Sequence, residues 1–195
     1  MAADIETLIK PYCGPIAICG SLRRKKQYDI KDIDIVAVDI DRFSINMVLG
    51  QICTSTHPTA EKITFVCRGI PGEIFFVNSV QEFEVMKLER TGDFQFTRTL
   101  AQNAITKGMV FRFSKDKGYY KIPMYGLYKI TGTWWDEDAD RANHKHYLIG
   151  DMVNAVCWHE DEIIETIFNR QIPPESRSWW QSESRDSGEQ DTDNR

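Results

Sequence analysis

The stretch that decides the fold is residues 30–38, Ile-Lys-Asp-Ile-Asp-Ile-Val-Ala-Val, in which two aspartates interrupt a run of β-branched residues. β-branched side chains favour strands, and residues two apart in a strand point to the same face. Asp32 and Asp34 therefore project side by side. Two such carboxylates repel each other unless a cation lies between them, and Mg²⁺ prefers carboxylate and phosphate oxygens. The pattern predicts a strand that carries a metal site.

A second group of residues lies about ten positions upstream. Residues 16–19 predict a short strand, which leads into Gly20-Ser21 and then into Arg23 and Arg24. A glycine lets the backbone approach a phosphate closely, and guanidinium groups suit bidentate phosphate contacts. The segment therefore indicates a triphosphate cradle. Taken by itself, each pattern also has an ordinary explanation. The Gly-Ser segment is also typical of a turn followed by solvated arginines, and the Asp pair is also typical of the end of a strand.

Length and composition describe a globular chain. Its 195 residues are enough for one compact unit, or for a domain with a small appended subdomain, and its 42% apolar and 27% charged fractions are ordinary. No apolar run is long enough to span a membrane, and the N-terminus is acidic where a secretory signal is basic. We therefore expect a protein that is neither secreted nor membrane-bound, located in the cytoplasm, or in the nucleus of a eukaryote.

The charge is acidic and unevenly distributed. Residues 182–195 carry five acidic and two basic side chains, are rich in Gly and Ser, and predict a disordered acidic tail. The formal net charge is −5, so the rest of the chain carries only −2. A body that is not basic argues against tight, nonspecific binding to duplex DNA.

Apolar spacing predicts an α+β protein. Residues 44–52, 81–88, 94–106 and 161–169 have helical periodicity, while residues 33–38, 63–67 and 73–77 predict strands, the last two joined as a hairpin through 68–72. Thr91-Gly92-Asp93 predicts a break between two helices, with a helix N-cap.

The ordered set of motifs resembles family X DNA polymerases and the wider polymerase-beta-like nucleotidyltransferase superfamily. Gly20-Ser21 followed by Asp32-x-Asp34 is similar to the signature of that superfamily. Downstream, Thr91-Gly92, the Tyr-Gly-Leu of 125–127 and the Pro-Pro-Glu-x-Arg of 173–177 resemble further family motifs. The resemblance covers roughly residues 5–178. It is to a minimal form of the family, because the Gly-Ser motif stands only 20 residues from the start of the sequence.

The resemblance implies a fold and a site. It implies a nucleotidyltransferase palm at 1–88, built as a mixed β-sheet with helices on one side, and a small thumb-like α/β subdomain at 89–181. The catalytic residues implied are Asp32, Asp34 and Glu73, which would also hold two Mg²⁺ ions, with Mn²⁺ as a possible substitute. The nucleotide-binding residues implied are Gly20, Ser21, Arg24, Thr91 and Gly92.

The implied reaction adds a nucleoside monophosphate from a nucleoside triphosphate to a 3′-hydroxyl by two-metal in-line phosphoryl transfer. The implied partners are the nucleoside triphosphate and a primed or gapped DNA, bound by a monomer. Two departures matter: Glu73 stands where the family has Asp, and Glu89-Arg90 stands where many members have Tyr-Phe. Two alternatives therefore stay open, a nucleotidyltransferase that modifies tRNA, protein or a small molecule, and a catalytically silent palm that binds nucleic acid or nucleotide.

Overall fold

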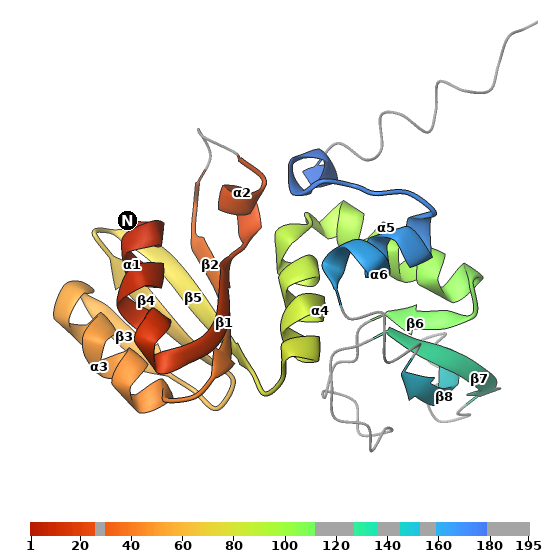
Figure 1. Ribbon diagram of the computed structural model, residues 1–195, viewed down its shortest axis with the longest axis horizontal. Helices are drawn as coiled ribbons and strands as arrows, with labels where there is room; N and C mark the ends of the chain where they lie inside the picture. The colour runs from red at the N-terminus through yellow and green to blue at the C-terminus, as the bar shows by residue number, and fades with distance from the viewer. Residues whose placement is uncertain (26–29, 112–126, 136–144, 153–158, 179–195) are drawn as a thin grey trace, which may run out of the picture.

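The computed structural model describes residues 1–25, 30–111, 127–135, 145–152 and 159–178, and it is an α+β protein with two halves (Figure 1). The first half contains α1 (Ala2–Ile9), β1 (Cys13–Ile18), the single turn α2 (Gly20–Arg23), β2 (Ile33–Asp39), α3 (Arg42–Ile52), β3 (Ser55–Pro58), β4 (Lys62–Cys67) and β5 (Ile70–Val77). The second half contains α4 (Val80–Thr91), α5 (Phe94–Thr106), β6 (Met109–Phe111), β7 (Leu127–Trp135), β8 (Lys145–Met152), α6 (Glu160–Phe168) and the 3-10 turn η4 (Pro174–Ser178). The tail predicted at 182–195 and the motif at 125–126 lie outside the described residues.

The first half is built on a five-stranded mixed sheet. Its strand order is β1-β2-β5-β4-β3, and β2 and β5 are parallel while the other neighbours are antiparallel. The predicted strands at 33–38, 63–67 and 73–77 are confirmed as parts of β2, β4 and β5. The register of the parallel pair places Asp34 opposite Glu73. The sheet thus brings two of the three predicted catalytic positions next to each other.

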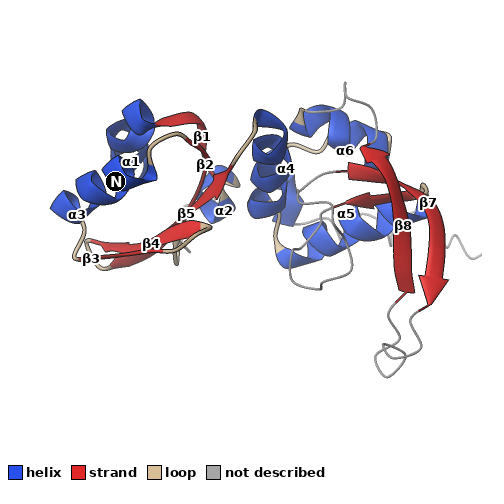
Figure 2. Cartoon of the chain, turned by 90° about the horizontal axis from the view of Figure 1, so that it is seen from below, coloured by secondary structure: helices blue, strands red, loops and turns tan. Residues whose placement is uncertain are grey.

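Helices cover both faces of this sheet, which corrects the expectation of helices on one side only. Alternate residues of β2, Ile33 and Ile35 among them, pack on one face against α1 and α3. Val36 and Phe75 point to the opposite face, where they meet Phe83 of α4. The same alternation that exposes the two aspartates on one face of β2 therefore leaves that face enough apolar surface to bind a helix. Figure 2 shows α4 between the sheet and the second half.

Helix α4 belongs to two hydrophobic cores. Phe83 and Met86 face the sheet, whereas Val85 and Leu88 point the other way into a core formed with α5, α6, β6 and β7. These pairs lie on opposite sides of a helix with 3.6 residues per turn. The domain boundary predicted after residue 88 therefore falls inside a helix that both halves share. Within the described part of the chain, every helix is too short or too polar to cross a lipid bilayer.

A buried ion cluster joins the two halves at one end of α4. The carboxylate of Glu160, at the start of α6, accepts hydrogen bonds from Arg23 of α2 at 2.9 and 2.5 Å and from Arg177 of η4. Lys87 of α4 lies 3.6 Å from the same carboxylate. Burial alone would raise the pKa of Glu160, but its two arginine partners outweigh burial and hold that pKa below its ordinary value. Four segments far apart in the sequence thus meet at one carboxylate.

Replacement of Glu160 by Gln should lower the free energy of unfolding by about 3–5 kcal/mol, because it leaves the buried Arg177 and the partly buried Arg23 without this counter-charge. The matched control is Glu175→Gln, which makes the same chemical change in an ion pair with Lys25 that is exposed on both sides. Exposed pairs contribute little, so this control should change stability hardly at all. Urea unfolding of both variants measures the difference. Equal effects would show that the cluster does not hold the halves together.

Candidate functional site

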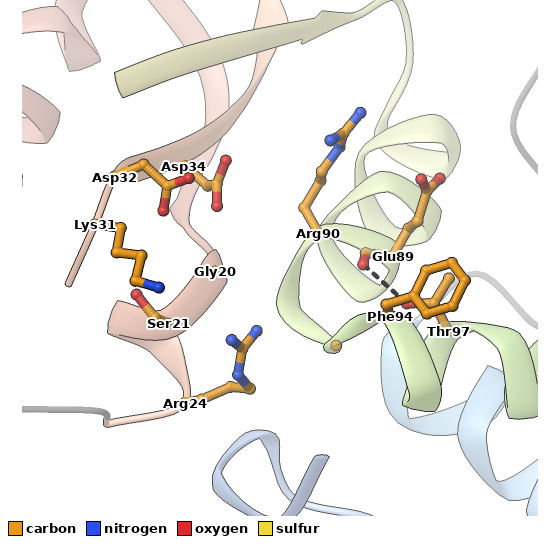
Figure 3. Close-up of a pocket in the computed structure, with 11 residues that line it drawn as sticks. Gly20, Ser21, Arg24, Lys31, Asp32, Asp34, Glu89, Arg90, Phe94 and Thr97 are labelled. Carbon is orange, nitrogen blue, oxygen red and sulfur yellow. Dashed lines mark hydrogen bonds between the residues drawn. The ribbon is translucent and has the colours of Figure 1, made fainter. Parts of the chain in front are cut away.

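A cavity of about 460 Å³ lies where the two halves face each other (Figure 3). The first half lines it with residues from α2, β2 and the segment before β2, and the second half lines it with the end of α4 and the start of α5. The lining residues are Gly20, Ser21, Arg24, Lys31, Asp32, Asp34, Glu89, Arg90, Gly92, Phe94 and Thr97. The cavity therefore contains most of the residues that the sequence predicted for a nucleotide site.

Asp32, just before β2, and Asp34, within it, form the acidic wall of the cavity. Asp32 and Asp34 project from the same face of the strand, as their spacing predicts (Figure 3). The backbone of Gly20 lies against the Asp34 side chain, so closely that a Cβ on Gly20 would overlap the carboxylate, and Gly20 has a φ of +62°. The amide of Cys19 also donates a 2.8 Å hydrogen bond to the carbonyl of Asp34. Glycine is thus required at position 20 for α2 to approach the acidic wall.

The acidic wall carries uncompensated charge. Burial, and next the neighbouring carboxylate of Asp32, raise the pKa of Asp34 to about 6. Arg90 and Arg24 oppose this rise, and Glu73 adds to it. Two carboxylates that are held together against burial and mutual repulsion would be stabilised by a divalent cation, and Mg²⁺ prefers carboxylate oxygens. The residues at this wall therefore fit a divalent cation, with Asp32 and Asp34 as the side chains that would hold it.

Basic side chains from both halves also line the cavity, next to the carboxylate of Glu89. Arg24 donates a 2.6 Å hydrogen bond to the carbonyl of Thr91, the last residue of α4. The guanidinium of Arg90 stacks 3.8 Å from the ring centre of Phe75. The Nε atoms of both arginines and the hydroxyl of Ser21 are buried and have no hydrogen-bond partner among the described residues. Buried polar atoms are usually paired, so this wall has unused capacity to donate hydrogen bonds.

Glu73 lies next to the acidic wall but is engaged elsewhere. Lys62 of the neighbouring strand β4 donates a 2.5 Å hydrogen bond to its carboxylate, and Glu73 does not line the cavity. In the described part of the chain, no three His, Cys, Asp or Glu side chains are arranged to hold a metal ion. The backbone thus places the predicted third carboxylate beside Asp34, while its side chain is held by a lysine.

The remaining predicted residues divide into lining and supporting positions. Gly92 lines the cavity, but Thr91 is fully buried behind it. The Thr91 hydroxyl accepts a 2.8 Å hydrogen bond from Arg23 and donates one of 2.6 Å to the carbonyl of Lys87. Thr91 and Arg23 therefore support Arg24 and do not face the cavity.

The sequence did not predict five of the lining residues, which are Lys31, Glu89, Arg90, Phe94 and Thr97. Arg90 directly precedes the Thr91-Gly92 motif, so its place next to a predicted nucleotide-binding turn was the available signal. Phe94 follows the predicted N-cap Asp93, whose side chain accepts a 2.8 Å hydrogen bond from the amide of Phe96. That cap fixes the start of α5, and its first residue lies at the cavity.

Comparison with known proteins gives no relative for this site. No protein-family model matches the chain, and a search of curated proteins finds no significant match.

Asp34→Asn should stabilise the protein at alkaline pH and not at acidic pH. Because the folded state raises the pKa of Asp34 from 3.8 to about 6, the unfolded chain releases this proton first, and stability falls as the pH rises through that window. We expect a gain in unfolding free energy of about 1–3 kcal/mol near pH 8, which disappears near pH 4. Denaturant titrations in a metal chelator measure it. Asp32→Asn removes one cause of the shift and should reduce the same pH dependence; an equal gain for Asp34→Asn at both pH values would contradict the assignment.

Proposed function

We propose that the protein is a nucleotidyltransferase of the family X DNA polymerase type, which adds a nucleoside monophosphate from a nucleoside triphosphate to the 3′-hydroxyl of DNA. The observation that carries the proposal is the cavity that Asp32 and Asp34 line together with Arg24, Lys31 and Arg90. Acidic residues suited to a divalent cation, next to donors suited to phosphates, match the needs of phosphoryl transfer. The five-stranded sheet would then be the palm, and the second half the thumb.

The basic wall would bind the triphosphate. Arg24 is anchored on Thr91 through one nitrogen and keeps its buried Nε unpaired within the described structure, so it can orient a phosphate without losing its own support. Arg90 is held flat by Phe75 and adds a second guanidinium. Guanidinium groups bind phosphate oxygens in a fixed geometry, so the β- and γ-phosphates would leave as pyrophosphate with their charge neutralised.

The acidic wall would hold Mg²⁺, or Mn²⁺ in its place, through Asp32 and Asp34. When bound, such ions neutralise phosphate charge and make the attacking hydroxyl more acidic. Glu73 would complete this wall and accept the proton of the 3′-hydroxyl. Its register opposite Asp34 supports that role, and the role requires its carboxylate to leave Lys62.

A second candidate is a silent palm that binds nucleotide or nucleic acid without chemistry. The ion pair between Lys62 and Glu73 favours it, because a carboxylate that stays paired cannot accept a proton. The acidic net charge, in turn, favours an acceptor other than duplex DNA. The same assay addresses both: the protein is incubated with Mg²⁺ or Mn²⁺, labelled nucleotides and primed, gapped and single-stranded DNA, tRNA and protein acceptors.

Asp32→Asn and Asp34→Asn should each abolish nucleotide transfer in this assay and leave the protein folded. Each change removes a negatively charged oxygen ligand and leaves the size of the side chain unchanged, so the loss can be assigned to charge. The matched control is Asp161→Asn on the exposed first turn of α6, which should retain full activity. Transfer by either active-site variant at the parent rate under saturating Mg²⁺ would reject the proposed reaction.

Substitutions at Glu73 and Lys62 separate the two candidates. If Glu73 takes part in transfer, Glu73→Gln should abolish activity, whereas Glu73→Asp should retain it because it keeps the charge. Lys62→Met should then raise activity and tighten Mn²⁺ binding measured by electron paramagnetic resonance, because it frees the Glu73 carboxylate. A silent palm predicts instead that the parent transfers no nucleotide to any acceptor and that none of the three variants changes this.

A further inference from the structure

One side chain at the cavity does not fit its polar chemistry. Phe94 is 76% exposed, although it lines a cavity whose other residues are mostly charged or small. It stands at the first position of α5, and Figure 3 shows its ring on the side of the cavity opposite Asp32 and Lys31. An exposed phenylalanine has a large apolar surface in water, and here that surface adjoins the cavity with its charged residues.

The local structure prevents Phe94 from turning into the core. The position that α5 offers to the core is filled by Phe96, which is fully buried and stacks on Phe168 with 5.8 Å between ring centres. A Cβ on Gly92 would overlap the Phe96 ring, so this corner is already filled. The cap from Asp93 fixes the start of the helix and leaves the Phe94 ring outside the core.

The two sides of the cavity therefore suit chemically different parts of one ligand. The side with Arg24 and Lys31, from the first half, suits an anion, and the side with Phe94, from the second half, suits a flat apolar group. A nucleoside triphosphate has both parts in one molecule. The Thr97 hydroxyl, one turn after Phe94, donates a 3.4 Å hydrogen bond to the carbonyl of Glu89 and so ties this helix start to the end of α4. The aromatic side is thus held in place before any ligand arrives.

We infer that Phe94 is the stacking surface for the base of the nucleoside triphosphate, and this inference rests on the proposed function. Stacking on an aromatic ring contributes to binding with any base, because every base has a π-face. The site would therefore bind all four nucleotides with similar affinity and without a template. Selection among them would have to come from another part of the complex.

Equilibrium binding by calorimetry, in the presence of Mg²⁺, tests the inference with two probes. The first probe is a deoxynucleoside triphosphate, and all four are titrated separately. The second is inorganic tripolyphosphate, which has the three phosphates of a nucleotide without its base. Phe94→Ala should weaken nucleotide binding about 5- to 100-fold, the range expected for one stacked base, and leave tripolyphosphate binding unchanged. Phe94→Tyr, which keeps a ring, should bind nucleotide like the parent.

Two control variants complete the design. Phe43 of α3 is also 76% exposed but lies outside the cavity, so Phe43→Ala should leave both probes unaffected. Arg24→Ala should weaken both probes, because it acts on the phosphates. If Phe94→Ala weakens both probes equally, or neither, the stacking role is overturned while the phosphate site stands. If the parent protein binds neither probe, the proposed function falls and the stacking role with it.

Discussion

The arrangement of the site depends on the hydrogen bonds that the carboxylate of Glu160 accepts from two arginines. This carboxylate is buried, and it accepts hydrogen bonds from Arg23 of the first half and from Arg177 near the end of the described chain. Arg23 lies between the cavity residues Ser21 and Arg24, so fixing Arg23 fixes the turn that carries them. A buried ion pair gains little over an apolar contact but is costly to break. The cluster is therefore better understood as a constraint on geometry than as a source of stability.

The acidic wall has the opposite energetic character. Asp34 is ionised at neutral pH against burial and the charge of Asp32, and a pKa of about 6 measures that opposition. Gly20 brings the backbone of α2 against the same side chain, which leaves no room for a larger residue between them. The fold thus fixes the geometry of one part of the interface through Glu160 and holds an unfavourable charge pair at the cavity. Strongly shifted pKa values such as that of Asp34 are common at functional sites.

The sequence predicted features that depend on local pattern and failed on those that depend on register. The paired aspartates, the Asp93 cap and the helices at 44–52, 94–106 and 161–169 follow from periodicity and capping, and α3, α5 and α6 confirm them. Strand β3 was missed because Ser55–Pro58 is a polar edge strand without apolar alternation. The Glu160 cluster joins residues up to 137 positions apart, and no local pattern predicts such a pair. The helix at 81–88 was predicted and is part of α4, but its packing on the second face of the sheet was not, because its sequence gave no sign that its two sides contact different cores.

The contact between Glu73 and Lys62 shows how one register decides a site. The sequence placed the hairpin connection at 68–72, but the strands pair from Cys67 and Ile70 onward, so β5 begins three residues earlier than expected. Glu73 therefore lies inside the strand, flanked by Asp34 on one side and by β4 on the other. Its charge is already balanced by Lys62, whereas that of Asp34 is not. A cation in the cavity would therefore be stabilised most by the carboxylate of Asp34. The carboxylate of Glu73 could bind the same cation only after its ion pair with Lys62 is broken.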